Sequence, residues 1–144
     1  MKTNLRTNQL AVALMMLTGL AAASCAGSKE IKLESSGDIP AAEAEVAIGS
    51  NSNGNTTFDL EVRHLALPSR VDPEATVYVV WLLGGDSAAR AQNMGALKVD
   101  DNLNGAYSGV TPLRDFVLSV TAEPSSAESS PTGKALLYTT ISTK

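Results

Sequence analysis

The stretch Thr76-Val-Tyr-Val-Val-Trp-Leu-Leu83 decides the fold, because seven apolar residues follow Thr76 without interruption. β-Branched and aromatic side chains favour strands and lose rotamer freedom in helices. Alternate residues of a strand point to opposite faces, so a run that is apolar throughout predicts a central strand buried on both sides. Tyr78 and Trp81 would lie on opposite faces. One ring should fill the core, while the other packs under a loop or forms a surface anchor.

Six further strands are predicted around this run. Apolar and polar side chains alternate in residues 43–49 and 57–65, which is the period of a half-buried strand. The other four predicted strands are 93–99, 105–110, 116–122 and 134–142. Turn-forming segments separate every pair. We therefore predict an all-β domain over residues 43–144, a single antiparallel β-sandwich of about seven strands with immunoglobulin-like general architecture.

Composition argues against several function classes. The 144 residues include 11 Lys and Arg against 15 Asp and Glu, without a basic cluster, so we expect no nucleic-acid partner. One histidine and one cysteine are too few for a copper or zinc site. His64 would continue the alternation of Phe58 and Val62 into the core face near a strand end. Because no nucleophile motif accompanies it, we expect no enzyme and no cofactor.

Residues 100–105 (DDNLNG) match the first half of a calcium-binding loop, with Asp100, Asn102 and Asn104 as the candidate ligands. The twelfth position of such a loop requires a bidentate Glu, but Thr111 stands there. No helical pattern flanks the segment. A hairpin is therefore favoured over a calcium site, its final Asn-Gly pair supplying positive φ, and we expect no bound metal.

The first 24 residues have the layout of a secretory signal peptide. Lys2 and Arg6 precede an uncharged, mainly apolar run over residues 10–23. This run has 14 residues, whereas a membrane-spanning helix needs about 20. We therefore expect export rather than a transmembrane anchor.

Ala22-Ala23-Ser24-Cys25 resembles the lipobox of bacterial lipoproteins, although that family most often has Leu where Ala22 stands. The resemblance implies cleavage before Cys25 and attachment of diacylglycerol to its sulfur. Two or three acyl chains, such as palmitate, anchor a protein stably where one does not. Ala26 replaces the Asp of an inner-membrane retention signal, which favours the outer membrane in a Gram-negative host. An ordinary signal-peptidase cut is the alternative and would leave an unpaired thiol in an oxidising compartment.

Residues 25–42 are predicted to comprise the lipidated cysteine and a flexible tether, because the segment after Cys25 is small, polar and without sustained periodicity. Such a tether averages about 23 Å end to end, enough to hold the domain clear of lipid headgroups. The alternative is that Ile31 and Leu33 form an edge strand. Removal of residues 1–24 leaves a net charge of −6, so membrane association is expected to come from the acyl chains alone.

Five segments share their order with a known family. They are Leu65-Ala-Leu-Pro68, Thr76-Val-Tyr-Val-Val-Trp-Leu82, Met94-Gly-Ala-Leu-Lys-Val99, Phe116-Val-Leu-Ser-Val-Thr-Ala-Glu-Pro124 and Pro131-Thr-Gly133. The set resembles the extracytoplasmic C-terminal domain of anti-sigma-K-type factors. This implies a β-sandwich outside the membrane in a regulated signalling protein. The family's cytoplasmic sigma-binding domain and transmembrane helix have no counterpart here, so direct inhibition of a sigma factor is not expected.

Together these features predict a lipid-anchored protein of the bacterial cell envelope, facing the periplasm or the exterior. Its sandwich should bind another envelope protein, or sense a condition there, without catalysis. Edge strands and interstrand loops, including the Ser-rich loop between Pro124 and Gly133, are the expected contacts. Two alternatives stay open: a structural spacer, and a hydrolytic or calcium-dependent domain in which Asp100, Asp101 and Asp115 converge.

Overall fold

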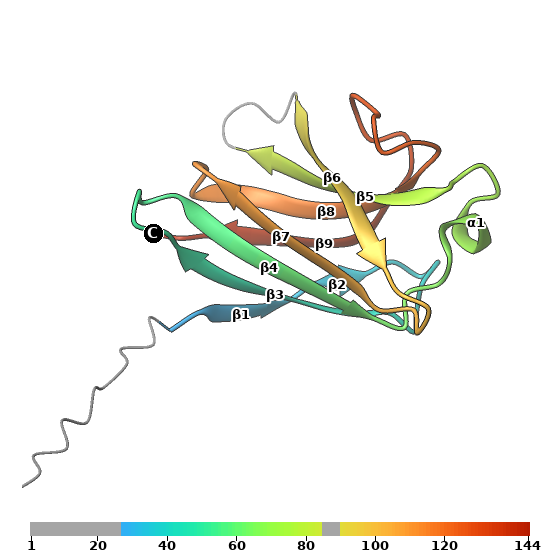
Figure 1. Ribbon diagram of the computed structural model, residues 1–144, viewed down its shortest axis with the longest axis horizontal. Helices are drawn as coiled ribbons and strands as arrows, with labels where there is room; N and C mark the ends of the chain where they lie inside the picture. The colour runs from blue at the N-terminus through green and yellow to red at the C-terminus, as the bar shows by residue number, and fades with distance from the viewer. Residues whose placement is uncertain (1–26, 85–89) are drawn as a thin grey trace, which may run out of the picture.

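The computed structural model describes residues 27–84 and 90–144 (Figure 1), so the predicted signal peptide, the lipobox and Cys25 lie outside the described residues. The predicted all-β sandwich is confirmed, and all seven predicted strands are present. The elements are β1 (Lys29–Lys32), β2 (Glu34–Ser35), β3 (Glu43–Ser50), β4 (Thr56–Arg63), α1 (Pro68–Val71), β5 (Val77–Gly84), β6 (Ala91–Val99), β7 (Gly105–Thr111), β8 (Asp115–Glu123) and β9 (Ala135–Ser142). No helix of the described residues is long and apolar enough to span a membrane.

The strands pair in the order β1-β3-β4-β7-β6-β5-β8-β9-β2, and every pair is antiparallel. One layer holds β1, β3, β4 and β7, and the other holds β5, β8, β9 and β2 (Figure 1). β6 joins the layers, because residues 91–97 pair with β5 and residues 98–99 pair with β7. The β5–β6 register shifts beside Met94, and Gly95 has φ +113°. This bulge lets β6 bend from one layer into the other.

The core lies between the layers and follows the predicted alternation. Its largest fully buried side chains on the facing strands include Phe58, Leu60, Tyr78, Leu82 and Leu118. Burial of this apolar surface is the main favourable contribution to folding.

The predicted tether is wrong from Lys29 onward. β1 pairs with β3, β2 pairs with β9, and only Leu33 separates the two strands. Leu33, Ile39 and Ala42 are buried in the core. Few apolar residues suffice in this segment because its backbone gains ladder hydrogen bonds from β3 and β9. The alternative of an edge strand is confirmed at Ile31 in β1, whereas Leu33 lies between β1 and β2, which add one strand to each layer.

His64 does not lie on the core face, so this prediction is wrong. It has φ +56° and is exposed, while Leu65 is fully buried. The left-handed backbone at His64 ends β4 and rotates the next residue into the core.

The outer face of β5 is also buried, which explains why its run is apolar throughout. Tyr78 faces the core, whereas Trp81 faces outward and lies beneath the loop of residues 124–133. Trp81 Nε1 donates a hydrogen bond to Thr121 Oγ1 at 2.8 Å. Asn93 Nδ2 donates to the carbonyls of Ser126 and Glu128 at 3.0 and 2.7 Å, which ties the loop to β6. The expectation that one ring packs under a loop is confirmed.

Glu123 is a fully buried carboxylate at the base of this loop. It accepts hydrogen bonds from the N–H groups of Thr132 (3.0 Å) and Gly133 (3.3 Å) and from the hydroxyls of Thr121 and Thr132. Burial raises the pKa of Glu123, but the bonds from these four donors outweigh it and leave the pKa below its usual value. In the described residues, no buried side-chain nitrogen or oxygen lacks a partner.

Candidate functional site

β7 has an edge without a neighbouring strand. Its full length, Gly105–Thr111, pairs with β4, but β6 pairs only with Gly105 and Ala106 before it turns away. Residues 107–111 are called the β7 edge below. Among the described residues, no strand pairs with the β7 edge on the side facing away from β4.

The hairpin before β7 determines which backbone groups point outward. The Asp100 N–H donates to the Asn104 carbonyl at 2.8 Å. Bonded pairs recur at every second residue of an antiparallel ladder, so Lys98 and Ala106 form the next one. Continuing along β7, Ser108 and Val110 direct their N–H and C=O groups to the same side, where β6 has already departed. No described residue pairs with these four groups.

The β7 edge lacks the features that usually protect a strand edge from other chains. Its sequence, YSGVT, contains no charged residue and no Pro, and Val110 is 51% exposed. By contrast, three of the four residues of β1 are charged, and β2 has only two residues. Charged residues and short length are the common means of protecting an edge. Compared with β1 and β2, the β7 edge is therefore unprotected.

Packing beneath the β7 edge holds it in place. The ring of Tyr107 stacks on Phe58 with centroids 6.0 Å apart, and its hydroxyl donates to the Met94 carbonyl at the bulge of β6. Burial raises the pKa of Tyr107, so the hydroxyl keeps its proton near neutral pH. Gly109 lies against the Phe58 ring, with which a Cβ atom would collide. The edge is thus supported from within.

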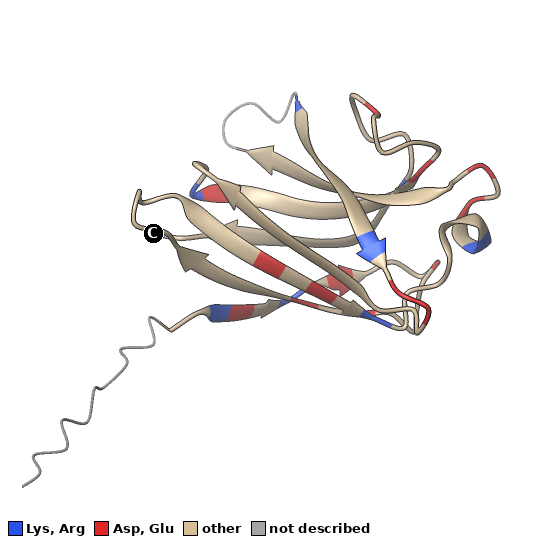
Figure 2. Ribbon diagram, viewed as in Figure 1, with Lys and Arg blue, Asp and Glu red and all other residues tan. Residues whose placement is uncertain are grey.

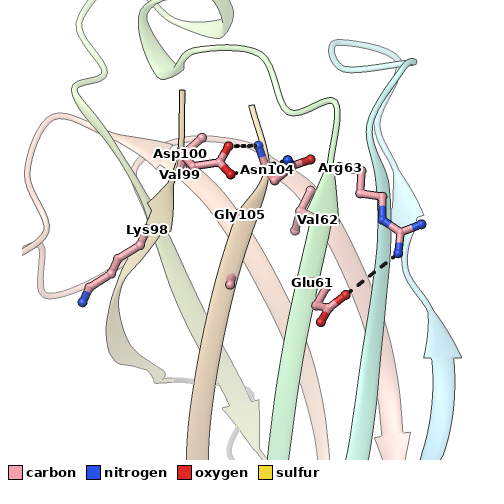
Figure 3. Close-up of a pocket in the computed structure, with 9 residues that line it drawn as sticks. Glu61, Val62, Arg63, Lys98, Val99, Asp100, Asn104 and Gly105 are labelled. Atoms are coloured by element: carbon pink, nitrogen blue, oxygen red, sulfur yellow. Dashed lines mark hydrogen bonds and ion pairs between the residues drawn. The ribbon is translucent and has the colours of Figure 1, made fainter. Parts of the chain in front are cut away.

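A groove of about 630 Å³ begins at Ala106, the residue that precedes the β7 edge (Figure 3). The small residues Gly105 and Ala106 line it, with Lys98 on one side of β7 and Glu61 and Arg63 on the other. Arg63 and Glu61 form an exposed ion pair at 4.0 Å, whereas Lys98 has no ion-pair partner in the described part of the chain. The groove therefore offers charged groups of both signs beside an uncharged edge.

The candidate calcium ligands form the predicted hairpin turn. Asp100 Oδ1 accepts the N–H groups of Asn102 (2.9 Å) and Asn104 (2.8 Å). The bond from the Asn104 backbone is the main reason that the pKa of Asp100 lies below its usual value. Positive φ occurs at Leu103 (63°), so the expectation for the Asn-Gly pair is wrong. The described residues contain no group of three or more His, Cys, Asp or Glu side chains that could hold a metal ion.

The acids proposed to converge in a hydrolytic site do not meet. Asp100 and Asp101 precede β7, whereas Asp115 follows it. The seven residues of β7 span about 24 Å at 3.4 Å per residue. Asp115 instead accepts a hydrogen bond from Ser142 Oγ at 2.6 Å and pairs with Lys144.

Comparison with models of known protein families gives no match, and no curated protein matches the chain. The resemblance to anti-sigma-K-type factors stays a prediction.

Proposed function

We propose that the chain is an exported protein of the cell envelope, anchored by lipid on Cys25, whose β-sandwich binds an extended segment of another envelope protein at the β7 edge. The unprotected backbone groups of Ser108 and Val110 carry this proposal. An extended peptide that adds to a sheet gains main-chain hydrogen bonds, and neighbouring pockets provide its specificity.

The groove supplies the second half of the recognition. A strand lying along the β7 edge would place its end near Ala106, on the Lys98 side of β7, with the Glu61–Arg63 pair on the other side of β7. The charged groups of the groove would discriminate among partner side chains by their charge. The β7 edge itself would accept any partner residue except Pro. The likeness to an extracytoplasmic domain of signalling proteins supports a regulatory partner. The proposed activity is binding without covalent chemistry.

A photo-crosslinking residue at Ser108 should capture a defined partner in intact cells, and Val110→Pro should lower that yield about fivefold. Proline removes the outward N–H, and one lost hydrogen bond of this kind is worth about 1 kcal/mol. The ladder to β4 does not use this N–H, so the denaturation midpoint should change little. Val110→Thr keeps both the N–H and the branched shape and is the matched control. A structural spacer predicts no defined crosslink, and that result would count against the proposal.

The anchor has its own test. Cys25→Ser should stop the incorporation of radiolabelled fatty acid and cause the unprocessed precursor to accumulate, because the sulfur is the acyl acceptor. Immunoblotting after cell fractionation distinguishes the unprocessed precursor from the processed, lipid-anchored protein. Continued fatty-acid labelling of the variant would show that the lipid is attached at a site other than Cys25.

A further inference from the structure

A second pocket opens at the end of the sandwich where the chain enters from Cys25. Its volume is about 360 Å³. Gly27, Lys29 and Ile31 line one side, and Arg114, Thr143 and Lys144 line the other. Lys29 has the same strand parity as Ile31, which packs against the core, so its side chain points toward the space between the layers.

The pocket combines cations in an otherwise acidic domain. Three basic residues and no Asp or Glu are among the described residues that line it. Lys144 forms an exposed pair with Asp115 at 3.9 Å, while Lys29 and Arg114 have no ion-pair partner among the residues that the structure describes. The Arg114 carbonyl accepts the N–H of Thr143 at 3.0 Å and its hydroxyl at 3.2 Å, which fixes the backbone of Arg114. Acidic residues also occur at this end, namely Glu30 on β1 and Asp115 at the start of β8, and others lie on β4 and in the turns at the far end (Figure 2).

Chain length places this pocket close to the proposed anchor. Gly27 lines the pocket, and Cys25 is only two residues earlier. Two residues span at most about 7 Å. The predicted tether of about 23 Å is replaced by a connection too short to lift the domain away. An acylated Cys25 therefore holds the pocket at the depth of the lipid headgroups.

We propose that this pocket binds the phosphate of an anionic phospholipid headgroup in the membrane that carries the anchor. The inference rests on the proposed lipidation of Cys25. Guanidinium and ammonium groups donate charge-assisted hydrogen bonds to phosphate. Ile31 and Ile48 supply apolar surface next to these groups for the glycerol portion. The net charge of −6 expected after processing does not indicate this local basic site, because it sums the charges of the whole chain.

The experiment uses the lipidated chain in nanodiscs of phosphatidylcholine, with or without phosphatidylglycerol. A polarity-sensitive fluorophore is attached to Ser50→Cys at the pocket rim, where acylation leaves the new thiol as the reactive one. Emission should shift to the blue only in the anionic discs and return as salt is added. Each cation near an anionic surface contributes about fivefold in affinity, so Lys29→Gln with Arg114→Gln should weaken the phosphatidylglycerol response about 25-fold.

Arg70→Gln removes an exposed cation of α1 at the far end, which has no ion-pair partner among the described residues, and is the matched control that should respond like wild type. Equal denaturation midpoints would show that the double variant folds. Identical emission in both kinds of disc would overturn the headgroup assignment while leaving the anchor intact. A blue shift caused by inorganic phosphate in phosphatidylcholine discs would assign the pocket to free phosphate instead. A chain that acquires no lipid and does not enter the discs would overturn both the anchor and this inference.

Discussion

Glu123→Ala should lower the free energy of unfolding by about 3 kcal/mol, because it leaves buried donors without their acceptor. Thr121 and Thr132 lose the carboxylate that accepts their hydroxyls, and the backbone of Gly133 loses its partner. The loop over Trp81 should then lift. Trp81 is the sole tryptophan, so its fluorescence emission should shift to the red in the folded variant. Urea unfolding monitored by circular dichroism measures the stability change.

Two further variants separate the carboxylate from the loop itself. Glu123→Gln keeps the shape but removes the charge. Its free energy of unfolding should therefore lie between those of wild type and Glu123→Ala. Ser129→Ala changes an exposed residue of the same loop and should stay within about 0.5 kcal/mol of wild type. If Glu123→Ala unfolded like Ser129→Ala, the network would not be what holds the loop.

Acidic pH should reproduce, in the wild-type protein, part of the stability loss caused by Glu123→Ala. The folded-state pKa of Glu123 is lowered, so its contribution is fully present above the unfolded pKa, about 4.3, and is lost as pH falls through the folded value. The stability gap between wild type and Glu123→Gln should therefore be constant near neutral pH and narrow below about pH 4. A gap that widened in acid would contradict the lowered pKa.

Leu33→Ala should destabilise the protein by about 2 kcal/mol through the cavity left by a buried leucine. Lys32→Ala changes the neighbouring residue, whose side chain is 86% exposed and forms an exposed pair with Glu45 at 3.7 Å. Such pairs contribute about 0 to 1 kcal/mol, so this control should lose little stability. Denaturant unfolding of the two variants measures the difference. Equal stabilities would mean that residues 29–35 act as a tether after all.

The strands were predictable where burial is periodic along one segment. Phe58, Leu60 and Val62 alternate with charged residues, and the run over residues 76–83 is apolar on both sides. Both patterns are local, so the sequence shows them directly. β1 was harder to recognise because it carries few apolar side chains and depends on hydrogen bonds from β3 and β9.

The candidate site depends on pairing that no local pattern encodes. YSGVT reads as an ordinary strand, and only the departure of β6 after Ala106 makes its outer groups available. The absence of charged residues in that strand was the one feature of the sequence that indicated an unprotected edge. Glu123 stands directly before Pro124 at the end of a strand, where no local pattern marks it as buried. Its burial arises because the loop returns to place Thr132 and Gly133 over it.

The ladder between β2 and β9 also determines when folding can finish. Glu34 pairs with Tyr138, so β2 cannot form its ladder until a residue 104 positions further along the chain has been synthesised. Contacts this distant along a chain form late and slowly. Until Tyr138 has been synthesised, the sandwich of a nascent chain stays open, a state that a translocation channel accepting unfolded polypeptide can carry.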